Sequence, residues 1–177
     1  MEKSIKSSAI NYGVYLAIIL ILFTVIGYAF KLDLLVNYWF MLLILPVTII
    51  AFGVVSTAKA KSMLGGFMSF KQAFTAYFIP VALAVSASTL FSILLFNFID
   101  PEAAEQIKQI LIDKTQSFME GVGATQTQIE ESIRPIREQD TFAFTTQLRS
   151  LAQSLVFFIV IGLIVALIMK KKDPNEA

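Results

Sequence analysis

Four long apolar runs without a charged residue constrain this chain more than any other feature. They cover residues 9–30, 38–58, 72–99 and 151–169. An α-helix of about 20 apolar residues crosses the hydrocarbon core of a bilayer, and buried helices of soluble proteins rarely reach this length. Composition agrees, because 56% of the residues are hydrophobic and only 15% are charged. We therefore expect one all-α integral membrane domain with four transmembrane helices, surrounded by the lipid bilayer.

Lysines predict how these helices are oriented. The segments 1–8, 59–71 and 170–177 together carry eight lysines. The segments 31–37 and 100–150 are together twice as long and carry six lysines or arginines. Because basic residues concentrate on the cytoplasmic side, we expect both termini, the loop 59–71 and the tail 170–177 inside the cell.

The first run allows a second interpretation. Lys3 and Lys6 resemble the charged region of a signal peptide, and the triplet Gly27-Tyr28-Ala29 resembles a cleavage site. The run is longer than the usual apolar core of a signal peptide, which favours a retained helix. Cleavage of residues 1–29 would leave three crossings.

Residues 100–150 are expected to form an extracytoplasmic amphipathic segment of helices. Asp100 and Pro101 are typical of a helix start, and apolar residues recur at helical spacing as far as residue 120. Thr127 with Glu130 matches a capping box for a second helix, and Asp140 is suited to cap a third. We expect this segment to lie over the bundle or along the bilayer surface.

Small residues at four-residue spacing predict where the helices pack on each other. Small side chains let helix backbones approach closely in lipid, where no hydrophobic force drives helices together. A ligand groove along the same face is the alternative interpretation, and the proline of the third run is expected to kink its helix. The candidate packing residues are Ala76, Pro80, Ala84, Ser88, Ser92, Gly162 and Ala166.

The loop before the third run is a candidate interface loop. Gly65 and Gly66 permit a sharp bend, and Phe70 with Lys71 could meet the membrane surface. Its three lysines fall short of the four to eight that usually indicate recognition of lipid headgroups. A structural turn is therefore the favoured interpretation.

The residues that are absent restrict the chemistry. The chain has no cysteine and no histidine, and the four apolar runs contain no Asp, Glu, Lys or Arg. No phosphate-binding loop, nucleophile elbow or metal-ligand cluster is recognisable. A net charge of +1 gives no indication of a nucleic-acid partner. We expect a protein that is not an enzyme and has no cofactor, no metal and no catalytic residue.

Short motifs around the third run resemble a known family. They are Gly65-Gly66, then Ser69-Phe70-Lys71-Gln72-Ala73-Phe74, and Phe98-Ile99-Asp100-Pro101-Glu102 at the exit of the run. With the four-span pattern, they are similar to the bacterial membrane proteins grouped as domain of unknown function 4199. The resemblance implies a multi-pass protein of the bacterial inner membrane and supplies no activity, cofactor or catalytic residue.

Three hypotheses for function follow. The first is a non-enzymatic structural or accessory protein that contacts a second copy of itself or a membrane-protein partner. The second is a component of a transporter or channel with a polar groove beside Ser86, Ser88 and Ser92. The third is a sensor that uses residues 100–150 to respond to lipid or to the state of the envelope.

Overall fold

The computed structural model describes residues 2–139 and 141–172, and within these residues it consists of helices and short connections. Four helical stretches of the described residues are long and apolar enough to cross a membrane, which confirms the predicted all-α class and the number of helices suited to span a membrane. The elements are α1 (Glu2–Phe30), the 3-10 turn η1 (Leu32–Val36), the π-helical turn η2 (Phe40–Ile44), α2 (Leu45–Met63), α3 (Phe70–Leu94), the π-helical turn η3 (Leu95–Ile99), α4 (Pro101–Gly121), α5 (Gln126–Glu138) and α6 (Phe144–Met169).

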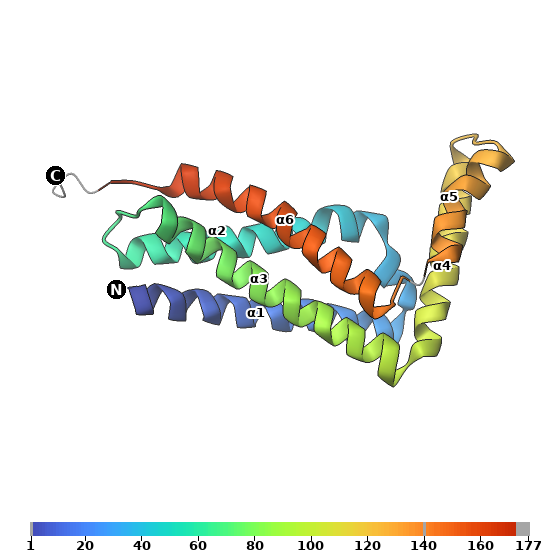
Figure 1. Ribbon diagram of the computed structural model, residues 1–177, viewed down its shortest axis with the longest axis horizontal. Helices are drawn as coiled ribbons and strands as arrows, with labels where there is room; N and C mark the ends of the chain where they lie inside the picture. The colour runs from blue at the N-terminus through green and yellow to red at the C-terminus, as the bar shows by residue number, and fades with distance from the viewer. Residues whose placement is uncertain (1, 140, 173–177) are drawn as a thin grey trace.

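Helix α3 is the centre of the bundle, since it contacts α1, α2 and α6. These four helices run lengthwise, and the start of α1 and the end of α6 lie at the same end of the bundle (Figure 1). Helices α4 and α5 stand across the opposite end. We call α4 and α5 the hairpin, its side of the bundle the hairpin end, and the other side the terminal end.

The bundle core is apolar and closely packed. Leu16 of α1, Tyr77 and Val81 of α3 and Phe158 of α6 are buried together. Many large apolar side chains on the outside of the same helices are exposed, including Leu22, Leu90 and Ile164. An exposed apolar surface on all sides of a helical bundle is the surface that a lipid environment covers.

The connection between α2 and α3 is shorter than the predicted loop 59–71. Helix α2 continues to Met63 because Ala60 remains in the packed interior, and α3 begins one residue before Lys71. Ser69 caps α3: its hydroxyl accepts a hydrogen bond from the Gln72 backbone N–H, and the Gln72 side chain accepts one from the Ser69 N–H. This reciprocal pair fixes where the third membrane helix begins.

The first helix of the hairpin begins at the predicted residue, whereas the second helix begins two residues earlier than predicted. Asp100 caps α4 by accepting a hydrogen bond of 3.0 Å from the Ala103 N–H. The capping box of α5 is Thr125 with Gln128, so the prediction of Thr127 with Glu130 is wrong. The earlier start allows α5 to pack against α4 through a cluster of isoleucines: Ile112, Ile129 and Ile133.

Helix α6 begins after Ala143 without a side-chain cap. The predicted cap Asp140 lies outside the described residues, as do residues 173–177 of the predicted tail. The helix ends at Met169, where the predicted fourth apolar run ends.

Candidate ligand cavity beneath the hairpin

The small residues of α3 divide into two groups. Ala76, Pro80 and Ala84 are fully or almost fully buried towards the terminal end and the middle of the helix. At Pro80 the approach is close: a Cβ placed on Gly13 of α1 would lie 3.0 Å from the Pro80 Cα. Ser88 and Ser92 belong to the other group, because both line a cavity.

The small residues of α6 are occupied inside the chain. Ala166 is fully buried, and a Cβ on Gly162 would lie 2.7 Å from the ring of Tyr77. The opposite edge of that ring faces Gly53 of α2, where a Cβ would lie 2.5 Å away. One aromatic ring of α3 therefore fills the space that two glycines leave open.

The candidate interface loop holds the end of α6. Gly65 and Gly66 adopt positive φ angles of 71° and 93°, which glycine reaches without strain. The turn that they make brings Met68 beside Lys171, and their backbones exchange two hydrogen bonds of 2.9 Å. Phe70 and Lys71 are exposed on the first turn of α3. The loop thus has an internal structural role at the terminal end.

The cavity has a volume of about 380 Å³ and lies at the hairpin end. Ligand pockets in proteins generally start at about 300 Å³. Its apolar wall comes from α1, α2 and α3, and its roof comes from α4. The wall includes Leu20, Phe23, Leu45, Ile49 and Val85, and the roof consists of Ile107, Lys108 and Leu111.

Polar groups line the same cavity and lack partners. The side chains of Ser88, Thr89 and Ser92 make no hydrogen bond with any described residue. Some other hydroxyls of the spans are bonded: that of Thr24 donates to Leu20 O at 3.1 Å, and that of Ser56 donates to Ala76 O at 2.8 Å. The buried hydroxyl of Tyr77, like the three in the cavity, has no partner among the described residues. These three hydroxyls on one helix are therefore available to form hydrogen bonds with a molecule in the cavity.

Polar side chains from α4 and from the start of α6 complete the lining. Lys108 is half-buried, and within residues 2–139 and 141–172 it has neither an ion pair nor a hydrogen bond. Gln147 and Ser150 border the cavity from α6 and are likewise without side-chain partners in the described part of the chain. Most of the lining is nevertheless apolar, a combination typical of sites for small molecules.

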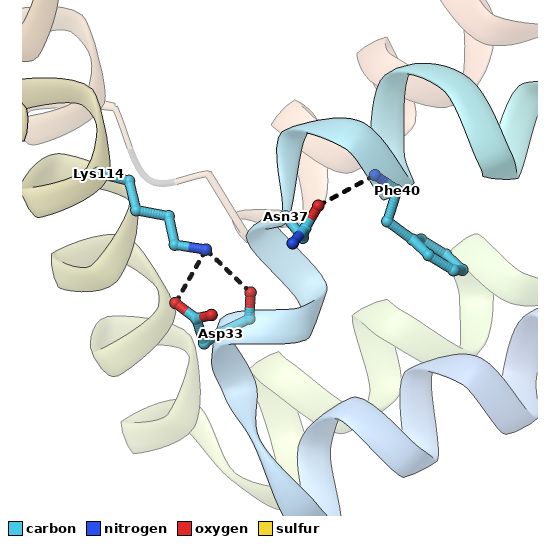
Figure 2. A network of polar contacts seen from close by, with 4 residues as sticks. All are labelled: Asp33, Asn37, Phe40 and Lys114. Atoms are coloured by element: carbon cyan, nitrogen blue, oxygen red, sulfur yellow. Dashed lines mark hydrogen bonds and ion pairs between the residues drawn. The ribbon is translucent and has the colours of Figure 1, made fainter. Parts of the chain in front are cut away.

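Three polar contacts hold α4 over the cavity. The Tyr28 hydroxyl donates to Asp100 Oδ2 at 2.9 Å, and the hydroxyls of Tyr38 and Thr115 lie 3.1 Å apart. Figure 2 shows the third, in which Lys114 reaches from α4 to η1. Its Nζ lies 2.8 Å from Asp33 Oδ1 and 3.2 Å from the Asp33 carbonyl oxygen.

These contacts affect the two carboxyl groups. The Ala103 backbone N–H and the Tyr28 hydroxyl hold the pKa of Asp100 below its usual value. The hydrogen bond from Lys114 lowers the pKa of Asp33. Hydrogen bonds to a carboxylate favour its charged form, so both groups are ionised at neutral pH.

An apolar cluster and an amide support the roof. Val36, Phe96, Ala103 and Ile107 are buried together where α4 meets η1 and η3. The Asn97 side chain donates to Phe142 O at 2.8 Å and so ties the segment before α6 to the end of η3. The apolar cluster therefore fixes the roof on η1 and η3, and the amide fixes the segment before α6 on η3.

The cavity is closed towards the terminal end. Leu16, Tyr77 and Val81 are fully buried beyond it, and the cluster around Ala73 and Ala76 fills the remaining part of the bundle. Within the described residues the cavity therefore ends inside the bundle and does not continue as a path through it.

Sequence reasoning identified part of this site. Ser88 and Ser92 were candidate residues, and the proposed polar groove included both, but Ser86 does not line the cavity. Lys108 and Gln147 were missed, because neither lies in an apolar run. The one available signal was that Lys108 directly follows Ile107, on the edge of the apolar face of α4.

Comparison with known proteins places the chain in a family. The family model described as "Protein of unknown function (DUF4199)" matches residues 11–171, which include every residue that lines the cavity. No curated protein and no solved structure matches the chain. The match covers most of the sequence, and the chain belongs to the DUF4199 family.

Proposed function

We propose that this protein is a non-enzymatic sensor of the bacterial inner membrane that binds an amphiphilic small molecule beneath the hairpin. In this proposal both termini are cytoplasmic and the hairpin is outside. The observation that carries the proposal is a set of three hydroxyls, those of Ser88, Thr89 and Ser92, which face a cavity roofed by α4 and have no partner in the described part of the chain.

An amphiphile fits both parts of the lining. The three hydroxyls offer donors and acceptors to a polar head, and each hydrogen bond that they form with a ligand contributes about 0.5–1.5 kcal/mol. The wall from Leu20 to Ile49 offers an apolar surface on α1 and α2. A molecule with a polar head and an apolar body satisfies the hydroxyls and fills the apolar space.

The hairpin supplies a route by which binding is sensed. Ile107 and Leu111 touch the cavity, and Lys114 of the same helix forms the ion pair with Asp33. A ligand shifts a conformational equilibrium only by its difference in affinity for the two states. Because α4 is part of the cavity, a ligand distinguishes a docked hairpin from a displaced one.

The other two hypotheses gain less from the structure. The small residues that motivated self-association, including Ala76, Ala84 and Gly162, are buried within one chain. They give no reason to propose a homo-oligomer. A transport role would require a path, and buried side chains fill the bundle beyond the cavity.

Native mass spectrometry of the protein purified in a neutral detergent tests the proposal. We expect the unmodified protein to retain an amphiphile from the membrane. Ser92→Leu places an apolar side chain in the cavity and should abolish retention, whereas Ser86→Leu on the same helix lies outside the lining and should not. Equal retention by both variants, or no retention by the unmodified protein, would overturn the proposal.

A further inference from the structure

Lys108 lines the cavity, and its positive charge indicates what kind of headgroup the ligand carries. Within residues 2–139 and 141–172, it is the one charged side chain that lines the cavity. We propose that Lys108 selects an acidic headgroup, so that the ligand is an acyl-chain amphiphile carrying a carboxylate or a phosphate. This inference rests on the proposed function, since it names what the same cavity binds.

Within the described residues, the neighbouring charged residues of α4 do not form an ion pair with Lys108, so its ammonium group is available to bind an anion. Lys114, the other lysine of α4, is paired with Asp33. Glu105 lies one turn before Lys108, but its Oε1 accepts a hydrogen bond from Gln109 at 2.9 Å. A half-buried ammonium group without a counter-ion is a favourable place for an anion, because charge-assisted hydrogen bonds are the strong ones.

The remaining polar groups of the lining also suit an anion. A carboxylate or phosphate offers only acceptor oxygens, and hydroxyl and amide groups can donate to them. Ser88, Thr89, Ser92 and Gln147 are such donors, and they are without partners in the part of the chain that the structure describes. Among the residues that the structure describes, no carboxylate lines the cavity to oppose a negative headgroup.

Two sources supply this chemistry, namely free fatty acids and anionic phospholipids. The test compares them on the full-length protein in neutral detergent. Palmitate and phosphatidylglycerol are the acidic probes, and methyl palmitate is the uncharged counterpart of the first. We expect the unmodified protein to bind an acidic probe about tenfold more tightly than methyl palmitate.

Three variants test whether the ammonium group of Lys108 causes the preference for palmitate over methyl palmitate. Lys108→Gln should bind palmitate and methyl palmitate equally, and Lys108→Arg should restore the preference. Arg134→Gln changes an exposed cation of α5 that does not line the cavity, and it should behave as the unmodified protein. A circular dichroism melt of each variant checks that the fold is retained.

The possible results of these binding measurements lead to different conclusions. Preference for palmitate alone, or for phosphatidylglycerol alone, supports the inference and identifies the source of the ligand. Equal binding of charged and uncharged probes by the unmodified protein, still abolished by Ser92→Leu, overturns the role of Lys108 and leaves the proposed function intact. No binding of any probe overturns the inference about the headgroup, and the proposed function falls as well if native mass spectrometry finds no retained amphiphile.

Discussion

The packing of Tyr77 between two glycines gives a stability prediction that can be worked out from the structure. In Gly53→Ala the new Cβ would lie 2.5 Å from Tyr77 Cε2, and in Gly162→Ala it would lie 2.7 Å from Cδ1. Carbon atoms at optimal separation are about 3.5–4.0 Å apart, so about 1 Å of movement is needed at either position. The ring cannot withdraw from one new methyl group without pressing on the opposite helix.

The expected cost follows from this confinement. Overpacking a filled core destabilises by about 1–3 kcal/mol. Alanine offsets up to about 1 kcal/mol of that through its higher helix propensity. We therefore expect each of Gly53→Ala and Gly162→Ala to lower the free energy of unfolding by about 1–2 kcal/mol, and the double substitution to cost more than either alone.

Unfolding in mixed micelles of neutral detergent and dodecyl sulfate measures this change. Gly121→Ala is the matched control, because the same methyl group added to α4 meets nothing within 4 Å. It should leave the free energy of unfolding unchanged or raise it slightly. If Gly53→Ala and Gly162→Ala behaved like Gly121→Ala, the close packing of α2 and α6 on Tyr77 would be refuted.

Three further predictions concern single contacts. The buried Tyr77 hydroxyl has no hydrogen-bond partner in the described residues, so Tyr77→Phe should keep or raise the stability by up to about 1–3 kcal/mol in the same unfolding assay, and a clear loss would show that the hydroxyl is bonded. Ser69→Ala removes the cap of α3 and should cost about 1 kcal/mol, measured in parallel; an unchanged value would mean that the cap does not matter. The pKa of Asp33 is lowered in the folded protein, so its contribution to hairpin docking is present above the ordinary pKa of 3.8 and is lost as the pH falls further. The protection factor of the α4 amides, which is the intrinsic exchange rate divided by the measured rate at the same pH, should fall below about pH 4 and should already be lower at neutral pH in Asp33→Asn. A protection factor that does not change with pH and is the same in Asp33→Asn would refute the role of that ion pair.

The membrane helices could be predicted from the sequence because long uncharged apolar runs are a strong and local signal. Long runs without charge have one common explanation, and the start of α4 at Asp100 and Pro101 follows from the chemistry of those residues. The cap of α5 was missed because two overlapping capping patterns, at Thr125 and at Thr127, satisfy the same rule. Packing of α5 on α4 decides between them, and packing cannot be read from a local pattern.

The cavity was predictable only in part for the same reason. Regular spacing placed Ser88 and Ser92 on one face of α3 with Ala84, but the spacing does not tell where close packing ends. That limit is set by α4 lying across the bundle and by the π-helical turn η3 that leads into it. Lys108 and Gln147 come from distant parts of the chain, and only the fold brings them together.

Accessibility of Ser92 tests most directly the claim that a ligand cavity lies beneath the hairpin. The chain has no cysteine, so Ser92→Cys and Ser86→Cys each introduce a single reactive thiol. The account predicts that a maleimide labels Ser92→Cys in membranes, that palmitate slows this labelling, and that Ser86→Cys shows no such protection. Labelling of Ser92→Cys that palmitate does not change, or that equals the labelling of Ser86→Cys under both conditions, would contradict it.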